Sequence, residues 1–341
     1  MRRSATWRSH SRLHASTDSS SADMALCDGV EVVPSIFQET KMTTRKVDGS
    51  SRPHQKRSRR GRGTMVFGKL SEDGRSLELS DGSLHPMAGF GTYKIGFVPA
   101  SSNTAGQAGH DPERDPKEII KDAVAAGYRY IDCAQFYGNE KIVGTALAEC
   151  GVPRRDLYIV SKVWGDQIYN GREAVLAQLD RTLEDLGIEH LDLYLLHWPV
   201  PGKHVAAYQV LEEALAAGKI KAIGISNYTK EDYLEVAAVC KVKPLVNQIE
   251  MNPFLWRKNT YDFFMAQSIA IQSYRALRQA KEMENAALVS MAAKYGKTPA
   301  QVGWCSWNQN DCIHVHLPTV GCICVLRGDH LCLLCICVDG V

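Results

Sequence analysis

Long apolar segments and a strong net charge are both missing from this chain. No run of eighteen or more apolar residues occurs among its 341 residues, so we expect no membrane-spanning helix. The formal net charge is only +2, so neither a membrane nor a nucleic acid is the expected partner of the protein as a whole. With 45% hydrophobic residues, the sequence can form one large domain with a sizeable core.

The small net charge conceals an uneven distribution. Residues 1–64 contain 13 Lys and Arg against 6 Asp and Glu, so the remainder is net negative. This first part is rich in Ser, Arg and Thr, and we expect a disordered tail that ends before Met65. Its first seventeen residues resemble a mitochondrial transit peptide, and 51–63 resembles a nuclear signal or nucleic-acid patch. We favour a solvated linker, or upstream sequence translated from a wrong start.

Cysteine is abundant, but its spacing argues against a disulfide framework. Five of the 11 cysteines crowd the last twenty residues, and no secretory signal is recognised. CxC and CxxC pairs can bind zinc, but these pairs lie in an apolar segment with one nearby histidine, His330. We expect no metal, a cytoplasmic protein, and an atypical Cys-rich segment over 319–341.

From residue 77 onward, short β-rich runs alternate with amphipathic helical patterns. Alternating apolar residues around Asp81 and Gly82 predict a β-hairpin over 77–87. Apolar spacings of three and four predict helices over 117–127, 139–151, 172–187, 206–218, 230–240, 259–268, 284–296 and 299–308. Strands are predicted over 89–93, 128–132, 157–163, 191–198, 221–227, 244–250, 270–274 and 312–317.

Strict alternation of strands and helices with short turns indicates a parallel sheet with crossover helices. Eight such units over roughly 250 residues have the size of a TIM barrel. A doubly wound sheet is the alternative, but the GxGxxG turn that such a sheet carries after its first strand is missing. We therefore predict an α/β protein, a (β/α)8 TIM barrel over 65–318 with an N-terminal β-hairpin.

Polar residues close five successive predicted strands. Strand 128–132 ends in Asp132, and the next four reach Lys162, His197, Ser226–Asn227 and Gln248. One such residue is an ordinary structural feature. In a barrel, however, the carboxyl ends of all strands meet at one rim, where active sites lie. Five in succession therefore predict an active site.

The order of these motifs resembles the aldo-keto reductase superfamily, and in particular its aldose and diketogluconate reductases. The resemblance covers residues 68–317. It is carried by GFGTYK (89–94), YRYIDCAQFYGNE (128–140), VSKVW (160–164), LDLYLLHWPV (191–200), IGISNY (223–228), LVNQIEMNP (245–253) and KYGKTPAQV (294–302). It implies the reversible, NAD(P)H-dependent reduction of a small aldehyde or ketone to an alcohol, by a monomer.

The resemblance assigns four catalytic residues. Tyr137 is implied to be the general acid that protonates the carbonyl oxygen, while the hydride chemistry belongs to the nicotinamide. Lys162 is implied to lower the pKa of this tyrosine from its usual value of about 10. Asp132 is implied to hold the lysine, and His197 to orient the carbonyl.

The resemblance also implies cofactor and substrate contacts. Ser226, Asn227 and Gln248 match positions that hold the nicotinamide carboxamide, and Tyr274 matches the aromatic residue that stacks on the ring. The complete cofactor set is Thr92, Tyr93, Asp132, Ser226, Asn227, Gln248 and Tyr274. Trp164 and Trp198 are implied to wall the substrate pocket. Turn hydrogen bonds, core packing and rim packing are the structural alternatives for these residues.

Two late stretches depart from the family pattern. RALRQAKEM (275–283) replaces a Gly-containing loop at the pyrophosphate, which leaves Arg275 or Arg278 as candidate phosphate contacts. Beyond 317, the basic residues that grip the 2′-phosphate and the final helix are not recognisable. We therefore expect a barrel that is incomplete at its C-terminal end, and NADPH as cofactor with NADH as the alternative. A catalytically impaired, nicotinamide-binding regulatory barrel is the competing function.

Overall fold

The computed structural model describes residues 68–96, 114–276, 283–308, 313–316, 322–327 and 332–337. All of them fall within the unit Gly49–Val341. The predicted tail 1–64, Arg278 and the side chains of the late cysteines lie outside the described residues.

Eight parallel strands form a closed barrel, which confirms the predicted fold. Their order is β10-β3-β4-β5-β6-β7-β8-β9, and β10 closes the ring by pairing with both β3 and β9. The strands are β3 (Ala88–Gly91), β4 (Tyr130–Asp132), β5 (Tyr158–Val163), β6 (Leu193–Leu196), β7 (Ile223–Ser226), β8 (Val246–Glu250), β9 (Ala270–Tyr274) and β10 (Ile313–His316).

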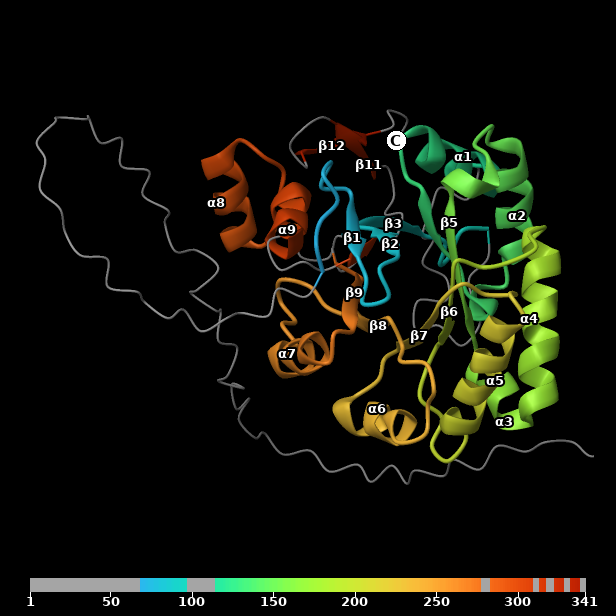
Figure 1. Ribbon diagram of the computed structural model, residues 1–341. Coiled ribbons are helices and arrows are strands. Elements are labelled where there is room, and N and C mark those ends of the chain that lie inside the picture. Colours follow the sequence, from blue (N-terminus) through green and yellow to red (C-terminus); the bar gives the residue numbers. More distant parts are fainter. Residues whose placement is uncertain are drawn as a thin grey trace, which may run out of the picture. The chain divides into compact units, whose positions relative to one another are not determined.

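The ring of strands is thus complete at its C-terminal end. The described residues beyond β10 form two further strands and no helix. β11 (Cys322–Arg327) and β12 (Cys332–Cys337) pair antiparallel there (Figure 1). This pair falls in the segment that we predicted only to be atypical.

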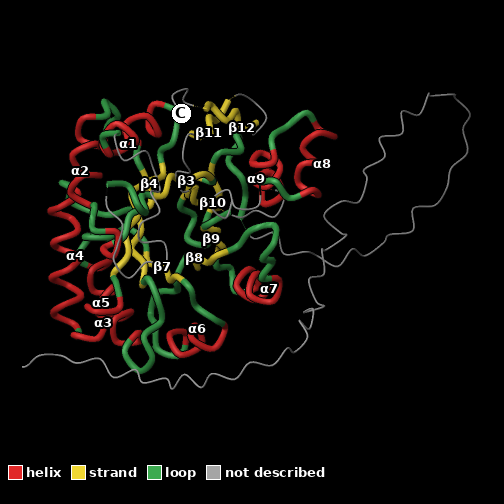
Figure 2. The backbone as a smooth tube through the Cα atoms, turned by 180° about the vertical axis from the view of Figure 1, so that it is seen from behind, coloured by secondary structure: helices red, strands yellow, loops and turns green. Residues whose placement is uncertain are grey.

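Helices lie along the outside of the strands, as Figure 2 shows from behind. They are α1 (Pro116–Ala125), α2 (Glu140–Glu149), α4 (Arg172–Leu186), α5 (His204–Ala216), α6 (Lys230–Ala237), α7 (Lys258–Ala266), α8 (Ala286–Tyr295) and α9 (Pro299–Asn308). Each matches a predicted helix within three residues at either end. Three short helical turns were not predicted: η2 (Gln135–Tyr137), η3 (Arg154–Asp156) and α3 (Gly165–Asn170).

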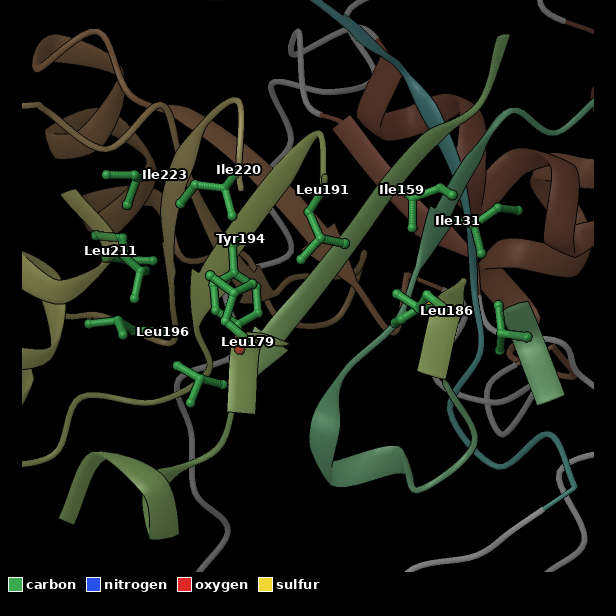
Figure 3. Close-up of a cluster of buried hydrophobic side chains, with 14 of the residues drawn as sticks. Ile131, Ile159, Leu179, Leu186, Leu191, Tyr194, Leu196, Leu211, Ile220 and Ile223 are labelled. Carbon is green, nitrogen blue, oxygen red and sulfur yellow. The ribbon is translucent and has the colours of Figure 1, made fainter. Parts of the chain in front are cut away.

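Side-chain alternation along the strands separates two apolar layers. Outward residues such as Ile131, Ile159 and Tyr194 belong to one buried cluster that also contains Leu179 of α4 and Leu211 of α5 (Figure 3). Inward residues fill the barrel itself and form a second cluster: Tyr130, Val160, Leu193, Leu195, Val246, Ala270, Ile313 and Val315. The same parity continues toward the carboxyl ends of the strands, where it turns the polar residues inward.

The N-terminal hairpin closes the inner cluster at the end opposite the polar rim. β1 (Ser76–Glu78) pairs antiparallel with β2 (Leu84–Pro86), which confirms the predicted hairpin. Leu77, Leu79 and Met87 belong to the inner cluster, and His85 is fully buried. The hairpin therefore forms an apolar floor with one polar side chain in it.

Candidate active site

The predicted catalytic residues meet because they extend the inward series of their strands. Asp132 follows Tyr130 by two positions on β4, and Lys162 follows Val160 by two on β5. His197 follows Leu195 by two, directly after the end of β6. Since alternate residues of a strand face the same side, all three point into the barrel at its carboxyl-terminal rim.

Lys162 is fully buried, and each hydrogen of its ammonium has an acceptor. Its Nζ lies 2.7 Å from Asp132 Oδ2, 2.8 Å from the Cys133 carbonyl oxygen and 3.3 Å from Tyr137 OH. An ammonium has three N–H donors and cannot accept a hydrogen bond. The lysine is therefore held in one position by a carboxylate, a carbonyl and a phenol.

Tyr137 is the last residue of the turn η2 and is followed by Gly138, which has a φ of 66°. Because its oxygen accepts from Lys162, its own O–H is directed away from the lysine, and the described residues offer it no acceptor. Burial and the Asp132 carboxylate raise the pKa of Tyr137 well above 10. The net pKa is thus raised because burial and the negative charge dominate, and the lowering effect of the Lys162 ammonium stays a prediction.

His197 completes the cluster as a neutral imidazole. Burial and the Lys162 charge hold its pKa well below 6.5. Its ring stands edge-on to Tyr137 and Trp164, at centroid distances of 5.9 and 4.9 Å. Phe136 stacks on Trp164 at 4.1 Å. Trp164 thus lines the same space as the catalytic groups.

Trp198, the other predicted pocket wall, is 44% exposed. Among the described side chains it makes no ring contact with the cluster, unlike Trp164. Its place in the substrate pocket stays a prediction.

The predicted carboxamide-binding residues form a second hydrogen-bonded group. Ser226 Oγ donates to the Gln248 carbonyl at 2.9 Å, and Asn227 Nδ2 donates to the His197 carbonyl at 3.0 Å. Tyr274 OH donates to Asn227 Oδ1 at 2.8 Å. Asn227 adopts a φ of 62°, a strained conformation that Asn tolerates better than most residues. The group joins β6, β7, β8 and β9 at the rim.

Gln248 connects the two groups, and Thr92 holds the backbone of Asp132. Gln248 Nε2 donates to Asp132 Oδ1 at 3.0 Å. Thr92 is fully buried, and its hydroxyl donates to the Asp132 carbonyl oxygen at 3.0 Å. Thr92 therefore positions Asp132, and its predicted cofactor contact stays a prediction. Tyr93 is half-buried, with its ring 5.1 Å from that of Tyr137.

These side chains fit a nicotinamide ring. Gln248 Oε1 accepts no hydrogen bond from the described part of the chain, although both N–H groups of the same amide are used. Tyr274 offers a half-buried aromatic ring beside it. Arg275 follows directly, half-buried, with one nitrogen 3.5 Å from Glu250 Oε2. The unused amide acceptor and the aromatic face suit the planar nicotinamide carboxamide, and the guanidinium suits the phosphates of the same dinucleotide.

Some members of the site were missed by sequence reasoning. Tyr130 donates to Asp132 Oδ1 at 3.2 Å, and Gln272 contacts Gln248 at 3.0 Å. Both precede a predicted site residue by two positions, so strand alternation was a usable signal. Phe136 and the Cys133 carbonyl depend on the turn after β4, for which the strand pattern gave no signal. Within the residues described, no three His, Cys, Asp or Glu side chains are grouped as metal ligands.

A closed eight-stranded barrel with a buried Asp–Lys pair, a tyrosine and a histidine at the carboxyl rim defines a TIM-barrel enzyme with acid–base chemistry. The model of the aldo/keto reductase family matches residues 99–308. The chain belongs to the aldo/keto reductase family. It is therefore an oxidoreductase that reduces carbonyl groups with a nicotinamide cofactor, as predicted.

Named relatives agree. Glyoxal reductase of Bacillus subtilis is 35% identical over 227 residues, which cover 67% of this chain and 76% of that protein. The 9,11-endoperoxide prostaglandin H2 reductase of Trypanosoma cruzi is 38% identical over 186 residues, which cover 54% and 65% of the two chains. A Bombyx mori aldo-keto reductase solved in complex with NADP superposes with a TM-score of 0.62 at 25% identity, covering 72% and 83%.

In the described part of the chain, no helix is both long and apolar enough to span a membrane.

Proposed function

We propose that this chain reduces a small aldehyde or ketone to an alcohol with NADPH, and that Tyr137 supplies the proton. The observation that carries the proposal is the hydrogen bond from Lys162 Nζ to Tyr137 OH at 3.3 Å. Because the ammonium can only donate, the phenol must turn its own hydrogen toward the space lined by His197 and Trp164. A carbonyl oxygen there would accept that hydrogen.

The surrounding residues support the same chemistry. The raised pKa keeps Tyr137 a phenol at neutral pH, which is the proton-donating form. The lowered pKa of His197 keeps the imidazole neutral, so one ring nitrogen can donate to a carbonyl oxygen and orient it. A bound nicotinamide would supply the hydride. Ser226, Asn227, Gln248 and Tyr274 would hold that ring, and Arg275 would meet its phosphates.

NADPH is proposed because a family member with the same fold was solved with NADP. We also propose that the chain acts as a monomer in the cytoplasm. The four catalytic groups all come from one chain, so the site needs no second copy. Sedimentation of the purified chain and cell fractionation test these two points.

The activity is tested with the full chain and a panel of glyoxal, glyceraldehyde and a simple ketone. Consumption of reduced cofactor is followed with NADPH and NADH side by side. We expect aldehyde-dependent oxidation with a higher kcat/KM for NADPH. A preference for NADH would contradict the cofactor proposal alone, whereas a folded protein that oxidises neither cofactor would contradict the proposed reaction.

A further inference from the structure

A continuous line of buried side-chain hydrogen bonds runs inside the barrel from the hairpin to Asp132. Its members are His85, Gln272, Gln248 and Asp132, each at most 2% exposed. Gln272 Nε2 lies 2.7 Å from His85 Nε2, and Gln248 Nε2 lies 3.0 Å from Gln272 Oε1. The same Gln248 nitrogen lies 3.0 Å from Asp132 Oδ1. The floor of the barrel is thereby connected to its catalytic rim.

The histidine end fixes the direction of these hydrogen bonds. His85 Nδ1 lies 2.8 Å from the Pro86 carbonyl oxygen, which can only accept, so this nitrogen carries the hydrogen. Burial lowers the pKa of His85 to about 4, and its ring packs against those of Tyr130 and Tyr158. The hydrogen bond to Pro86 and then the Asp192 charge oppose this lowering without reversing it. At neutral pH, Nε2 is therefore an acceptor, and Gln272 must turn its NH2 group toward it.

The aspartate end imposes the same direction independently. The Asp132 carboxylate accepts from Lys162 and Tyr130, so Gln248 must also present NH2 to it. That NH2 group meets Gln272 Oε1 with its second hydrogen. Reversing either amide would place donor against donor or acceptor against acceptor inside the barrel. The line therefore has a single consistent orientation.

We propose that His85 and Gln272 are positioning residues for the Gln248 amide. Asp132 decides which end of this amide carries the NH2 group, and Gln272, held by His85, fixes the plane of the amide. Oε1 is then held in one position, where it selects a ligand group that donates an N–H. No donor from the described residues reaches this oxygen. The inference rests on the proposed function, because the primary amide of nicotinamide is the group that offers such an N–H. The specificity of the cofactor site is then set partly by a residue of the N-terminal hairpin.

The test compares NADP⁺ with its 3-acetylpyridine analogue, in which a methyl group replaces the amide NH2. Calorimetry gives the Kd of both for the full wild-type chain and for His85→Phe, His85→Gln and Gln272→Met. His85→Phe keeps the ring contacts but removes the acceptor, whereas His85→Gln places an amide oxygen near the Nε2 position. Gln272→Met interrupts the line without altering the hairpin.

We expect the wild type and His85→Gln to bind the amide form more tightly than the analogue. His85→Phe and Gln272→Met should reduce this preference about 2- to 12-fold, the change that corresponds to one neutral hydrogen bond. The Kd of the analogue should stay the same. An unchanged preference in both variants, or an equal loss for both nucleotides, would overturn the proposal and leave His85 as part of the floor only.

A second measurement separates this proposal from the proposed function. If the wild type binds neither nucleotide, the proposed function fails. The positioning of Gln248 by His85 and Gln272 is then tested without nucleotide, by ¹⁵N NMR of the His85 ring at neutral pH. A hydrogen on Nδ1 in the wild type supports this positioning, and a hydrogen on Nε2 overturns it.

Discussion

Lys162 and Tyr137 form a hydrogen bond whose direction is fixed, because the ammonium donates to the phenol oxygen across 3.3 Å. Lys162 therefore orients the hydroxyl of Tyr137, while burial and the Asp132 carboxylate raise the net pKa of this phenol. In the proposed reaction, the hydrogen of Tyr137 is directed toward the space beside His197, and the two residues together present a proton donor of defined position.

Replacing Tyr137 by Phe should lower kcat by about 10²–10⁴-fold, the usual contribution of a positioned general acid. The Kd of the reduced cofactor should stay the same, because the proposed ring contacts lie on β7, β8 and β9. Stopped-flow and fluorescence titration measure the two quantities. Tyr169→Phe, at a tyrosine that is 63% exposed, is the matched control. Full activity in Tyr137→Phe would assign the proton to another group.

The second prediction concerns the contribution of the buried Lys162–Asp132 pair to the free energy of unfolding. Lys162→Met leaves the carboxylate buried without its partner, which should lower the free energy of unfolding by about 3–5 kcal/mol. Adding Asp132→Asn should recover part of this loss, because no uncompensated charge then remains. Urea unfolding measures both variants. Lys219→Met, in an exposed pair with Asp180, should change stability by less than about 1 kcal/mol. Equal losses at the two lysines would contradict the argument.

The barrel and most of the site could be predicted because both follow from periodicity. A strand repeats every two residues, so Asp132, Lys162 and Gln248 had to share one side with Tyr130, Val160 and Val246. Eight alternating strand–helix units over roughly 250 residues then indicated a TIM barrel, whose active site lies at the carboxyl ends of the strands. The resemblance supplied the roles of the residues, which periodicity alone does not give.

The features that escaped prediction depend on contacts between distant segments. The raised pKa of Tyr137 follows first from its burial, which depends on segments that are distant in the sequence. The line from His85 to Asp132 joins residues of β2, β4, β8 and β9, which no local pattern brings together. The helix α3 spans six residues and begins at a glycine, too little for a periodic signal.

Acid should destabilise the protein partly through His85. The pKa of His85 is lowered from 6.5 to about 4 in the folded protein. Between these two pH values, His85 is therefore protonated in the unfolded chain and neutral in the folded chain. The free energy of unfolding therefore falls as pH drops through this window, by about 3 kcal/mol in total for this group. His197 acts in the same direction, because its pKa is also lowered.

His85→Gln removes this titration while keeping an acceptor for Gln272. Between about pH 7 and pH 4 it should lose about 3 kcal/mol less stability than the wild type. Urea unfolding across this range, fitted for both proteins, checks the difference. All other titrating groups are shared, so their contributions cancel in the comparison. Parallel curves would show that His85 is not the source of the acid sensitivity.

The last prediction concerns the stability of a Gly144→Ala variant, because α2 and α4 meet at Gly144 without room for a side chain. A Cβ at this position would lie 2.6 Å from the Asp185 carbonyl oxygen and 2.6 Å from Leu186 Cα. Both are backbone atoms and cannot rotate away. Gly→Ala inside a helix normally stabilises by about 1 kcal/mol. Here the overlap should reverse the sign, to a loss of about 1–3 kcal/mol.

Separation of the two helices would also stretch the bond from Thr182 of α4 to Glu140 of α2, which is 3.0 Å long. Gly165→Ala is the control, since the nearest atom to its Cβ would be Val200 Cγ2 at an ordinary 3.4 Å. Thermal unfolding of both variants should show a lower Tm for Gly144→Ala only. A higher Tm in Gly144→Ala would mean that α2 and α4 can move apart at no cost. Helix propensity, and not the close approach, would then govern this position.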